Sequence, residues 1–215
     1  MLPKWKVQII DGINRKVAQG ATLTFVHTPK TAGTYTAQYL SLCNIKNISH
    51  RQSHDTAASF TILRDPVKRF ESYLNYRLSF KHPKKDFPER LRYVHYDKTI
   101  QLNEIVQKLH LQDIRKFTPF NTLKFWSKNV NLLITIDELE DTLSLLGFAN
   151  KLKGVKFERK NVSPKKRGTL SKEMVAKVSR FYLEDIALFN YWTRTYPPWN
   201  ENQQSPLQWC EPRLS

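Results

Sequence analysis

Cysteine is scarce in this chain of 215 residues, which contains only Cys43 and Cys210. Two thiols exclude a disulfide framework and a zinc site built from cysteines, and they leave room for one long-range bridge at most. A reducing compartment fits this composition best. We therefore expect a cytoplasmic protein.

Long apolar runs are absent as well. Residues 1–20 mix Lys4, Lys6, Asp11 and Arg15 with apolar side chains, so the segment never reaches the length of a signal-peptide core or of a membrane-spanning helix. The sequence therefore predicts a soluble chain with neither a signal peptide nor a transmembrane anchor.

Acidic residues are few compared with basic ones. The chain has 19 Asp and Glu against 35 Lys and Arg, which gives a formal net charge of +16. Such a charge favours anionic partners, which include nucleic acid, acidic glycans, phosphorylated nucleotides and membrane surfaces. The charge is uneven, because residues 151–172 hold nine basic residues and a single acidic one.

Three apolar, partly β-branched runs predict buried strands at residues 21–27, 58–63 and 131–136. Each is followed by a helical pattern. The first helix is expected at residues 34–42, and the second begins after Asp65 as N-cap, with Pro66 in its first turn. The third follows Asp137 and Glu140, which have the spacing of a capping box.

Repeated strand-to-helix order predicts an α/β fold, a P-loop-like three-layer domain with a central, mainly parallel sheet covered by helices. We expect one domain over residues 1–215, with a core at about 21–192 and an irregular tail at 196–215. Further helices are predicted at 100–109 and 171–189, the latter capped by Ser171.

The loop after the first strand has the composition of an anion site. Residues 27–34 contain small residues and Lys30 between a strand and a helix, where backbone N–H groups and the helix N-terminus point at an anion. Arg64 ends the second strand and adds another such site. A P-loop NTPase is disfavoured, because its lysine follows a glycine, whereas Lys30 precedes Gly33.

The two motifs together resemble those of sulfotransferases that use 3′-phosphoadenosine 5′-phosphosulfate (PAPS), especially the Golgi-type carbohydrate sulfotransferases that include the uronosyl 2-O-sulfotransferases. His-Thr-Pro-Lys-Thr-Ala-Gly-Thr at 27–34 is similar to the family's 5′-phosphosulfate loop, commonly Pro-Lys-Thr-Gly-Gly-Thr, with Ala32 replacing one glycine. Arg-Asp-Pro-Val-Lys-Arg-Phe-Glu-Ser at 64–72 is similar to its 3′-phosphate element.

The resemblance implies a PAPS-dependent sulfotransferase that modifies a hydroxyl of a carbohydrate or glycoconjugate by in-line displacement, without a metal. Lys30 is implied as the group that stabilises charge on the leaving phosphate oxygen. The remaining residues implied in PAPS binding are Pro29, Thr31, Ala32, Gly33, Thr34 and Tyr35 at the 5′ end, Arg64 and Ser72 at the 3′-phosphate, and Lys166, Arg167 and Gly168 in a closing loop.

A sulfotransferase needs a base for the acceptor hydroxyl. Related enzymes place a histidine before the second strand, where this chain has His50 and His54. We favour His54 slightly over His50, with Glu71 or another carboxylate as an alternative.

The acceptor is expected to be a glycan or glycoconjugate, with acidic sugars among the candidates. Residues 81–98 supply cations and aromatic rings for it, namely Lys81, Lys84, Lys85, Arg90, Arg92, Lys98, Tyr93, His95 and Tyr96. The same composition also suits a polyanion such as RNA. The alternative hypotheses are therefore a basic nucleic-acid-binding protein and, less favoured, a small P-loop kinase. The family's Golgi members have a membrane anchor, whereas we expect cytoplasmic residence here.

Overall fold

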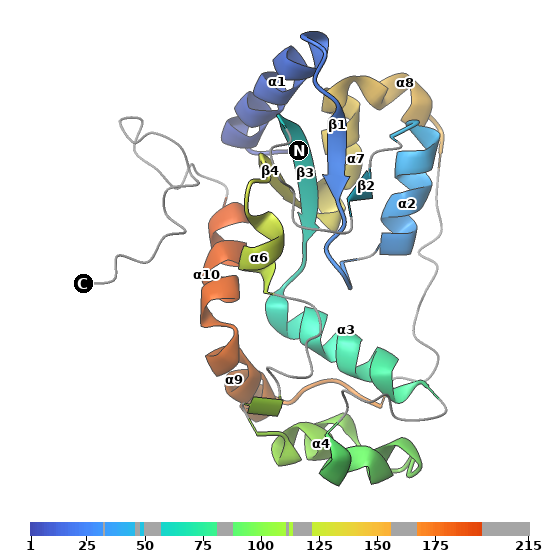
Figure 1. Cartoon of the computed structure of the whole chain (residues 1–215), viewed down its shortest axis with the longest axis vertical. Helices are drawn as coiled ribbons and strands as arrows, with labels where there is room; N and C mark the ends of the chain where they lie inside the picture. The colour runs from blue at the N-terminus through green and yellow to red at the C-terminus, as the bar shows by residue number, and fades with distance from the viewer. Residues whose placement is uncertain are drawn as a thin grey trace, which may run out of the picture.

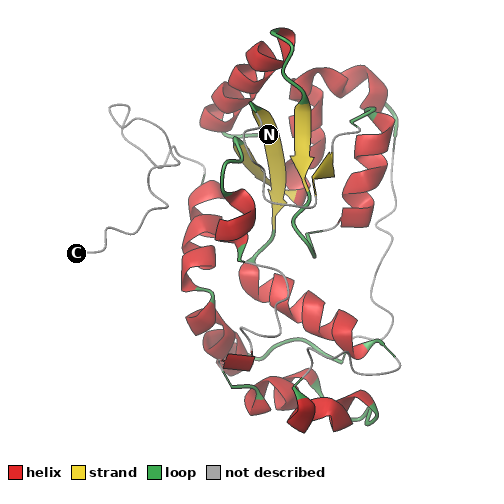
Figure 2. Ribbon diagram, viewed as in Figure 1, coloured by secondary structure: helices red, strands yellow, loops and turns green. Residues whose placement is uncertain are grey.

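The computed structural model describes residues 1–31, 33–45, 48–49, 57–80, 88–110, 112–113, 122–155 and 167–194. Four parallel strands form one sheet in the order β2-β1-β3-β4. The strands are β1 (Leu23–Val26), β2 (Ile48–Ser49), β3 (Ala58–Leu63) and β4 (Leu132–Thr135). The predicted α/β class is confirmed to this extent: an all-parallel sheet packs against helices (Figures 1 and 2).

One hydrophobic cluster surrounds the sheet. Phe60 and Ile62 of β3 are completely buried, as expected for a strand that pairs on both sides. The rings of Trp5 and Trp192 meet at 5.3 Å and join the two ends of the described chain. The helices around this cluster are α1 (Lys4–Ala18), α2 (Gly33–Leu42), α6 (Leu123–Ser127), η2 (Ile136–Glu138), α7 (Leu139–Leu143), η3 (Ser144–Phe148) and α8 (Ala149–Leu152).

A second hydrophobic cluster lies among helices beyond the carboxyl ends of β1 and β3 (Figure 1). Phe70 and Leu74 of α3 pack there with Ile105 of α4 and Val178 of α9. The helices are α3 (Pro66–Leu78), η1 (Glu89–His95), α4 (Leu102–Lys108), α9 (Lys172–Phe181) and α10 (Leu183–Trp192). The carboxyl edge of the sheet therefore faces a helical layer that begins with α3.

The predicted strands and the start of α3 are confirmed. Pro66 opens α3, and the Asp65 carboxylate accepts a hydrogen bond from the Lys68 N–H at 2.8 Å. The capping box was predicted at the wrong position, because Thr135 and Glu138 form it. Thr135 precedes the 3-10 turn η2, so the helical path starts earlier than the apolar pattern indicates.

The helix predicted at 171–189 is two helices. Ser171 caps α9 as expected, accepting from the Met174 N–H at 3.3 Å, but α9 ends at Phe181 and α10 begins at Leu183. Tyr182 between them is buried, so the apolar spacing continues across the break. Among the helices that the structure describes, none has the length and apolarity needed to span a membrane.

Candidate functional site

The two predicted anion motifs meet at a topological switch point of the sheet. From β1 the chain passes through α2 to β2 on one side, whereas from β3 it continues to β4 on the other side. In open α/β sheets, ligands bind outside the carboxyl ends of neighbouring strands whose connections diverge in this way. Residues 27–31 follow β1 and Arg64 follows β3, so both motifs lie at this position.

Two arginines hold the backbone of the first loop. Arg64 Nη1 donates to the carbonyl oxygen of Lys30 at 3.2 Å, and Arg69 Nε donates to that of Pro29 at 3.0 Å. Lys30 itself has a φ of 66°, a left-handed conformation that is uncommon for a lysine. The arginine contacts therefore fix a strained turn, as is frequent at functional sites.

Buried threonine hydroxyls hold the same loop from the strand side. Thr61 Oγ1 donates to the Val26 carbonyl at 2.6 Å, so its contact with Thr28 Oγ1 at 2.9 Å is one in which Thr28 donates. Thr31 Oγ1 donates to the Thr28 carbonyl at 2.6 Å. The Thr31 hydroxyl hydrogen, predicted to contact a ligand, is used inside the loop.

The side chain of Lys30 reaches α3. Its Nζ lies 3.8 Å from the centre of the Tyr76 ring, in a cation–π contact. Ser72 precedes Tyr76 by four residues and is therefore on the same face of α3. Together with the Arg64 contact to the Lys30 carbonyl, this arrangement places Lys30, Arg64 and Ser72 around one end of the sheet.

Both cations of the site are partly withdrawn from water. Burial lowers the pKa of Lys30, and the nearby positive charge of Arg64 lowers it further. Burial also lowers the pKa of Arg64, while Glu71 and Asp65 raise it. Within the described ranges, neither Lys30 nor Arg64 forms an ion pair. Two poorly hydrated positive charges without a paired carboxylate favour an anionic ligand.

Arg167 and Gly168 lie beside α3, but the Arg167 side chain points elsewhere. Its backbone N–H donates to Asn75 Oδ1 at 3.0 Å, whereas its Nη1 donates to the carbonyls of Val94 and Asp97 at 2.6 and 2.9 Å. The structure thus uses this guanidinium to tie the segment to η1. The Arg167 guanidinium is therefore not placed beside Arg64.

Gly168 has a φ of 101°, which suits glycine and explains this residue at the turn. Tyr35 lies in the first turn of α2 and contacts Tyr39, with the two hydroxyl oxygens 3.1 Å apart. The backbone of α2 begins at Gly33, so Gly33 and Thr34 form the helix start that was predicted after the loop.

The remaining predicted residues lie outside the described part of the chain, namely Ala32, His50, His54 and Lys166. Glu71, the alternative base, is buried. Its carboxylate lies 3.7 Å from Lys68 Nζ and accepts from the Leu170 N–H at 3.3 Å. These contacts give Glu71 a role in packing segment 167–170 against α3.

The sequence did not reveal the functions of Arg69 and Tyr76 at this site. A single arginine on a helix usually lies at the surface, yet only 5% of Arg69 is exposed. The sequence signal for its role is the Arg-Asp-Pro-x-x-Arg pattern, in which Arg69 is the second arginine. Tyr76 could have been found from its spacing of four residues after Ser72, which predicts a shared helix face.

No protein-family model, curated protein or solved structure matches this chain. Among the described residues, no group of three or more His, Cys, Asp or Glu side chains is arranged to hold a metal ion.

Proposed function

We propose that this protein is a PAPS-dependent sulfotransferase that transfers a sulfuryl group to a hydroxyl of a carbohydrate or glycoconjugate. One observation carries the proposal: the Lys30 loop and Arg64, from the two motifs that resemble the family's donor-binding elements, are in contact at the switch point between β1 and β3. A three-layer, P-loop-like architecture is part of the same proposal.

PAPS supplies an activated sulfuryl group and an anionic leaving group on one adenosine. On this proposal the Lys30 ammonium stabilises the negative charge that develops on the leaving phosphate oxygen, which is an interaction that strengthens during the reaction. Arg64 and the Ser72 hydroxyl bind the 3′-phosphate. Arg64 has N–H groups beyond the one that it donates to the Lys30 carbonyl, so it can hold the loop and a phosphate together.

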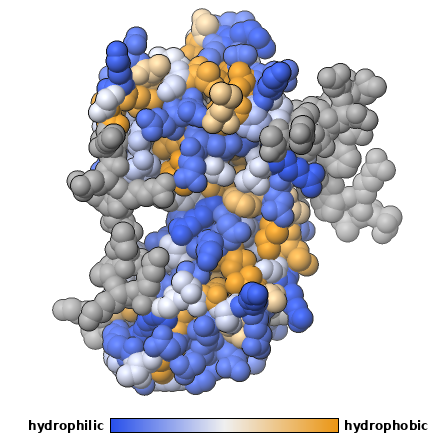
Figure 3. Space-filling view, turned by 180° about the vertical axis from the view of Figure 1, so that it is seen from behind, coloured by the Kyte–Doolittle hydropathy of each residue, from blue (hydrophilic) through white to orange (hydrophobic). Residues whose placement is uncertain are grey.

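His95 was predicted as part of the acceptor surface, but it is buried and so cannot contribute to it. The exposed residues in the described part of this surface are basic and aromatic. Tyr93 and Tyr96 are 44% and 62% exposed. Lys108 Nζ donates to the Tyr93 hydroxyl at 2.9 Å, and Arg90 and Lys98 are also exposed nearby in the chain. Hydrophilic side chains cover much of the lower, helical end of the molecule (Figure 3). Aromatic rings beside cations support an acceptor that includes acidic sugars.

The donor site is tested by calorimetric titration with the spent donor, 3′-phosphoadenosine 5′-phosphate. We expect Lys30→Ala and Arg64→Ala each to weaken binding by roughly ten- to a hundredfold, since hydrogen bonds to charged groups contribute about 1.5–3 kcal/mol. The exposed Lys16→Ala and Arg180→Ala variants are matched controls that should bind normally. Absence of binding to the wild type, or equal binding by all four variants, refutes the proposal.

The same titrations separate the alternatives. Binding of ATP that requires magnesium, with none of the spent donor, indicates a kinase. Oligonucleotide binding with a steep salt dependence, unaffected by the spent donor, indicates a nucleic-acid-binding protein.

A further inference from the structure

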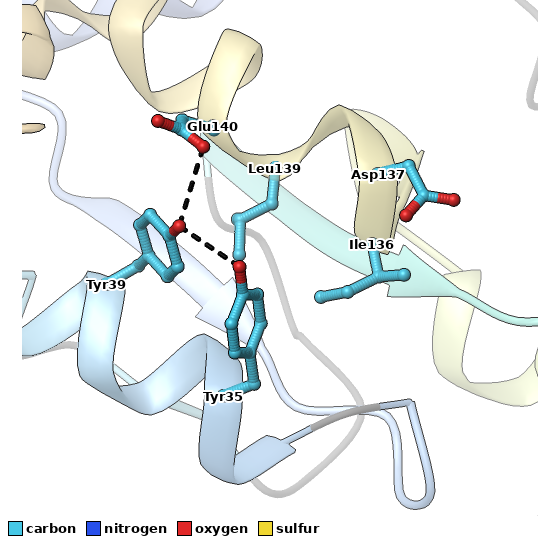
Figure 4. A pocket seen from close by; sticks show the side chains of 6 residues that line it. All are labelled: Tyr35, Tyr39, Ile136, Asp137, Leu139 and Glu140. Atoms are coloured by element: carbon cyan, nitrogen blue, oxygen red, sulfur yellow. Dashed lines mark hydrogen bonds between the residues drawn. The ribbon is translucent and has the colours of Figure 1, made fainter. Parts of the chain in front are cut away.

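A pocket lies between α2 and the segment that follows β4. Its walls are Tyr35, Tyr39, Ile136, Asp137, Leu139 and Glu140, and its empty volume is about 400 Å³, which includes space open to solvent. Figure 4 shows the two tyrosines on one wall and the residues of η2 and α7 on the other. The enclosed part of the cavity measures about 160 Å³. This is less than the roughly 300–1,000 Å³ of typical small-molecule sites, so the pocket has room for one sugar ring at most.

Hydrogen bonds give the pocket a defined polarity. Tyr39 donates its hydroxyl hydrogen to Glu140 Oε2 at 3.5 Å, and the Tyr35 and Tyr39 oxygens are 3.1 Å apart (Figure 4). A hydroxyl has one hydrogen, so Tyr39 accepts from Tyr35. The hydroxyl hydrogens of Tyr35 and Tyr39 are therefore both donated in the direction of Glu140. What this wall offers to a ligand is therefore oxygen lone pairs.

The carboxylates strengthen this polarity. Glu140 is exposed, and among the described residues its only hydrogen bond is the one from Tyr39, with no ion pair. Asp137 lines the same pocket and is also exposed. Both charged residues that line this pocket are therefore acidic, although the chain as a whole has a net charge of +16. Acceptor groups with negative charge select ligands rich in O–H or N–H⁺ donors and repel carboxylates and sulfates.

We propose that this pocket binds a sugar residue that has no acidic group, held by its hydroxyl or ammonium donors at Glu140, Asp137 and the Tyr35 oxygen. The inference deepens the proposed function, on which it rests for the identification of the ligand as part of the acceptor. Tyr35 is in the first turn of α2, directly after the loop assigned to the donor, so the pocket adjoins the donor site along the chain. The pocket thus selects a non-acidic sugar of the acceptor. The basic surface of η1 then contacts acidic sugars elsewhere in the same glycan.

The test is direct binding of monosaccharides to the full chain, measured by NMR titration without any donor. Glucosamine and glucuronate are the two probes. We expect glucosamine to bind and glucuronate to bind at least about tenfold more weakly. Glu140→Gln should weaken glucosamine binding by about tenfold, because the amide removes the charge and one acceptor. Glu173→Gln on α9 removes an exposed carboxylate elsewhere and should change nothing.

Tyr35→Phe provides a second variant and should weaken glucosamine binding about threefold. Glucuronate binding as tightly as glucosamine, or normal glucosamine binding by the Glu140→Gln and Tyr35→Phe variants, overturns the inference. A parallel titration with 3′-phosphoadenosine 5′-phosphate separates the two proposals. Donor binding without glucosamine binding refutes the pocket alone, whereas Glu140-dependent glucosamine binding without donor binding refutes the sulfotransferase alone.

Discussion

Mild acid should destabilise this fold through one buried histidine. His95 is 1% exposed, and burial is the main reason that its pKa falls from 6.5 to about 4. The positive charges of Lys98, Arg167 and Arg77 lower it further, while a hydrogen bond to the Phe80 backbone raises it. The folded protein therefore keeps His95 neutral, and the unfolded chain takes up the proton first as pH falls.

The size of the effect follows from the two pKa values. Between pH 7 and pH 5 the unfolded chain gains most of its proton on His95 and the folded protein gains little, which costs about 2 kcal/mol of stability. Stability from this source is present above the unfolded pKa of 6.5 and declines below it. Over this range most carboxylates stay ionised, so their contribution is small.

Urea unfolding at pH 7, 6 and 5, followed by circular dichroism, measures this loss. The His95→Gln variant is the control, because it has no group that titrates at this position. We expect the wild type to lose about 2 kcal/mol more than the variant between pH 7 and pH 5. Equal losses in the two proteins would show that His95 is not held neutral by its surroundings, and the reasoning from burial would be wrong.

Three substitutions test contacts that support the site, each by urea unfolding. Thr61→Val removes the acceptor of the buried Thr28 hydroxyl and should cost about 2 kcal/mol, whereas an unchanged stability would show that the hydroxyl finds another partner. Asp65→Ala removes the N-cap of α3 and should cost about 1 kcal/mol, with the exposed Asp11→Asn as a neutral control. Lys6→Met leaves the Glu138 carboxylate without the ammonium group that lies 2.7 Å away, and should cost about 3 kcal/mol of stability. If the unpaired carboxylate is the cause, the second change Glu138→Gln should restore the lost stability.

The sheet was predictable because its strands carry an unambiguous pattern. β3 consists of six buried residues, and its predicted bounds are the observed ones. β2 is only two residues long, which is too short for any periodicity to identify it. Helix α1 is not among the predicted elements, although Trp5, Ile10 and Ile13 are buried at helical spacing.

The break at Tyr182 could not be predicted from periodicity. Its side chain is buried in the second hydrophobic cluster, so the apolar spacing does not change where the backbone leaves the helix. The candidate site, too, has a part that the sequence predicts and a part that only tertiary packing decides. The motifs predicted that Lys30 and Arg64 serve one ligand, but the Arg64 contact to the Lys30 carbonyl depends on how closely α3 approaches the loop, which tertiary packing sets.

Helix α3 couples the anion loop to the helical part of the molecule. Arg69, near its N-terminus, holds the Pro29 carbonyl, and Tyr76, near its C-terminus, contacts Lys30. On its other side, Glu71 and Asn75 accept hydrogen bonds from the backbone of segment 167–170. A shift of α3 would move the Lys30 ammonium, the loop carbonyls and segment 167–170 together. The geometry of the proposed donor site therefore depends on the second hydrophobic cluster as much as on the sheet, because Phe70 and Leu74 are among the α3 side chains that pack this helix into the cluster.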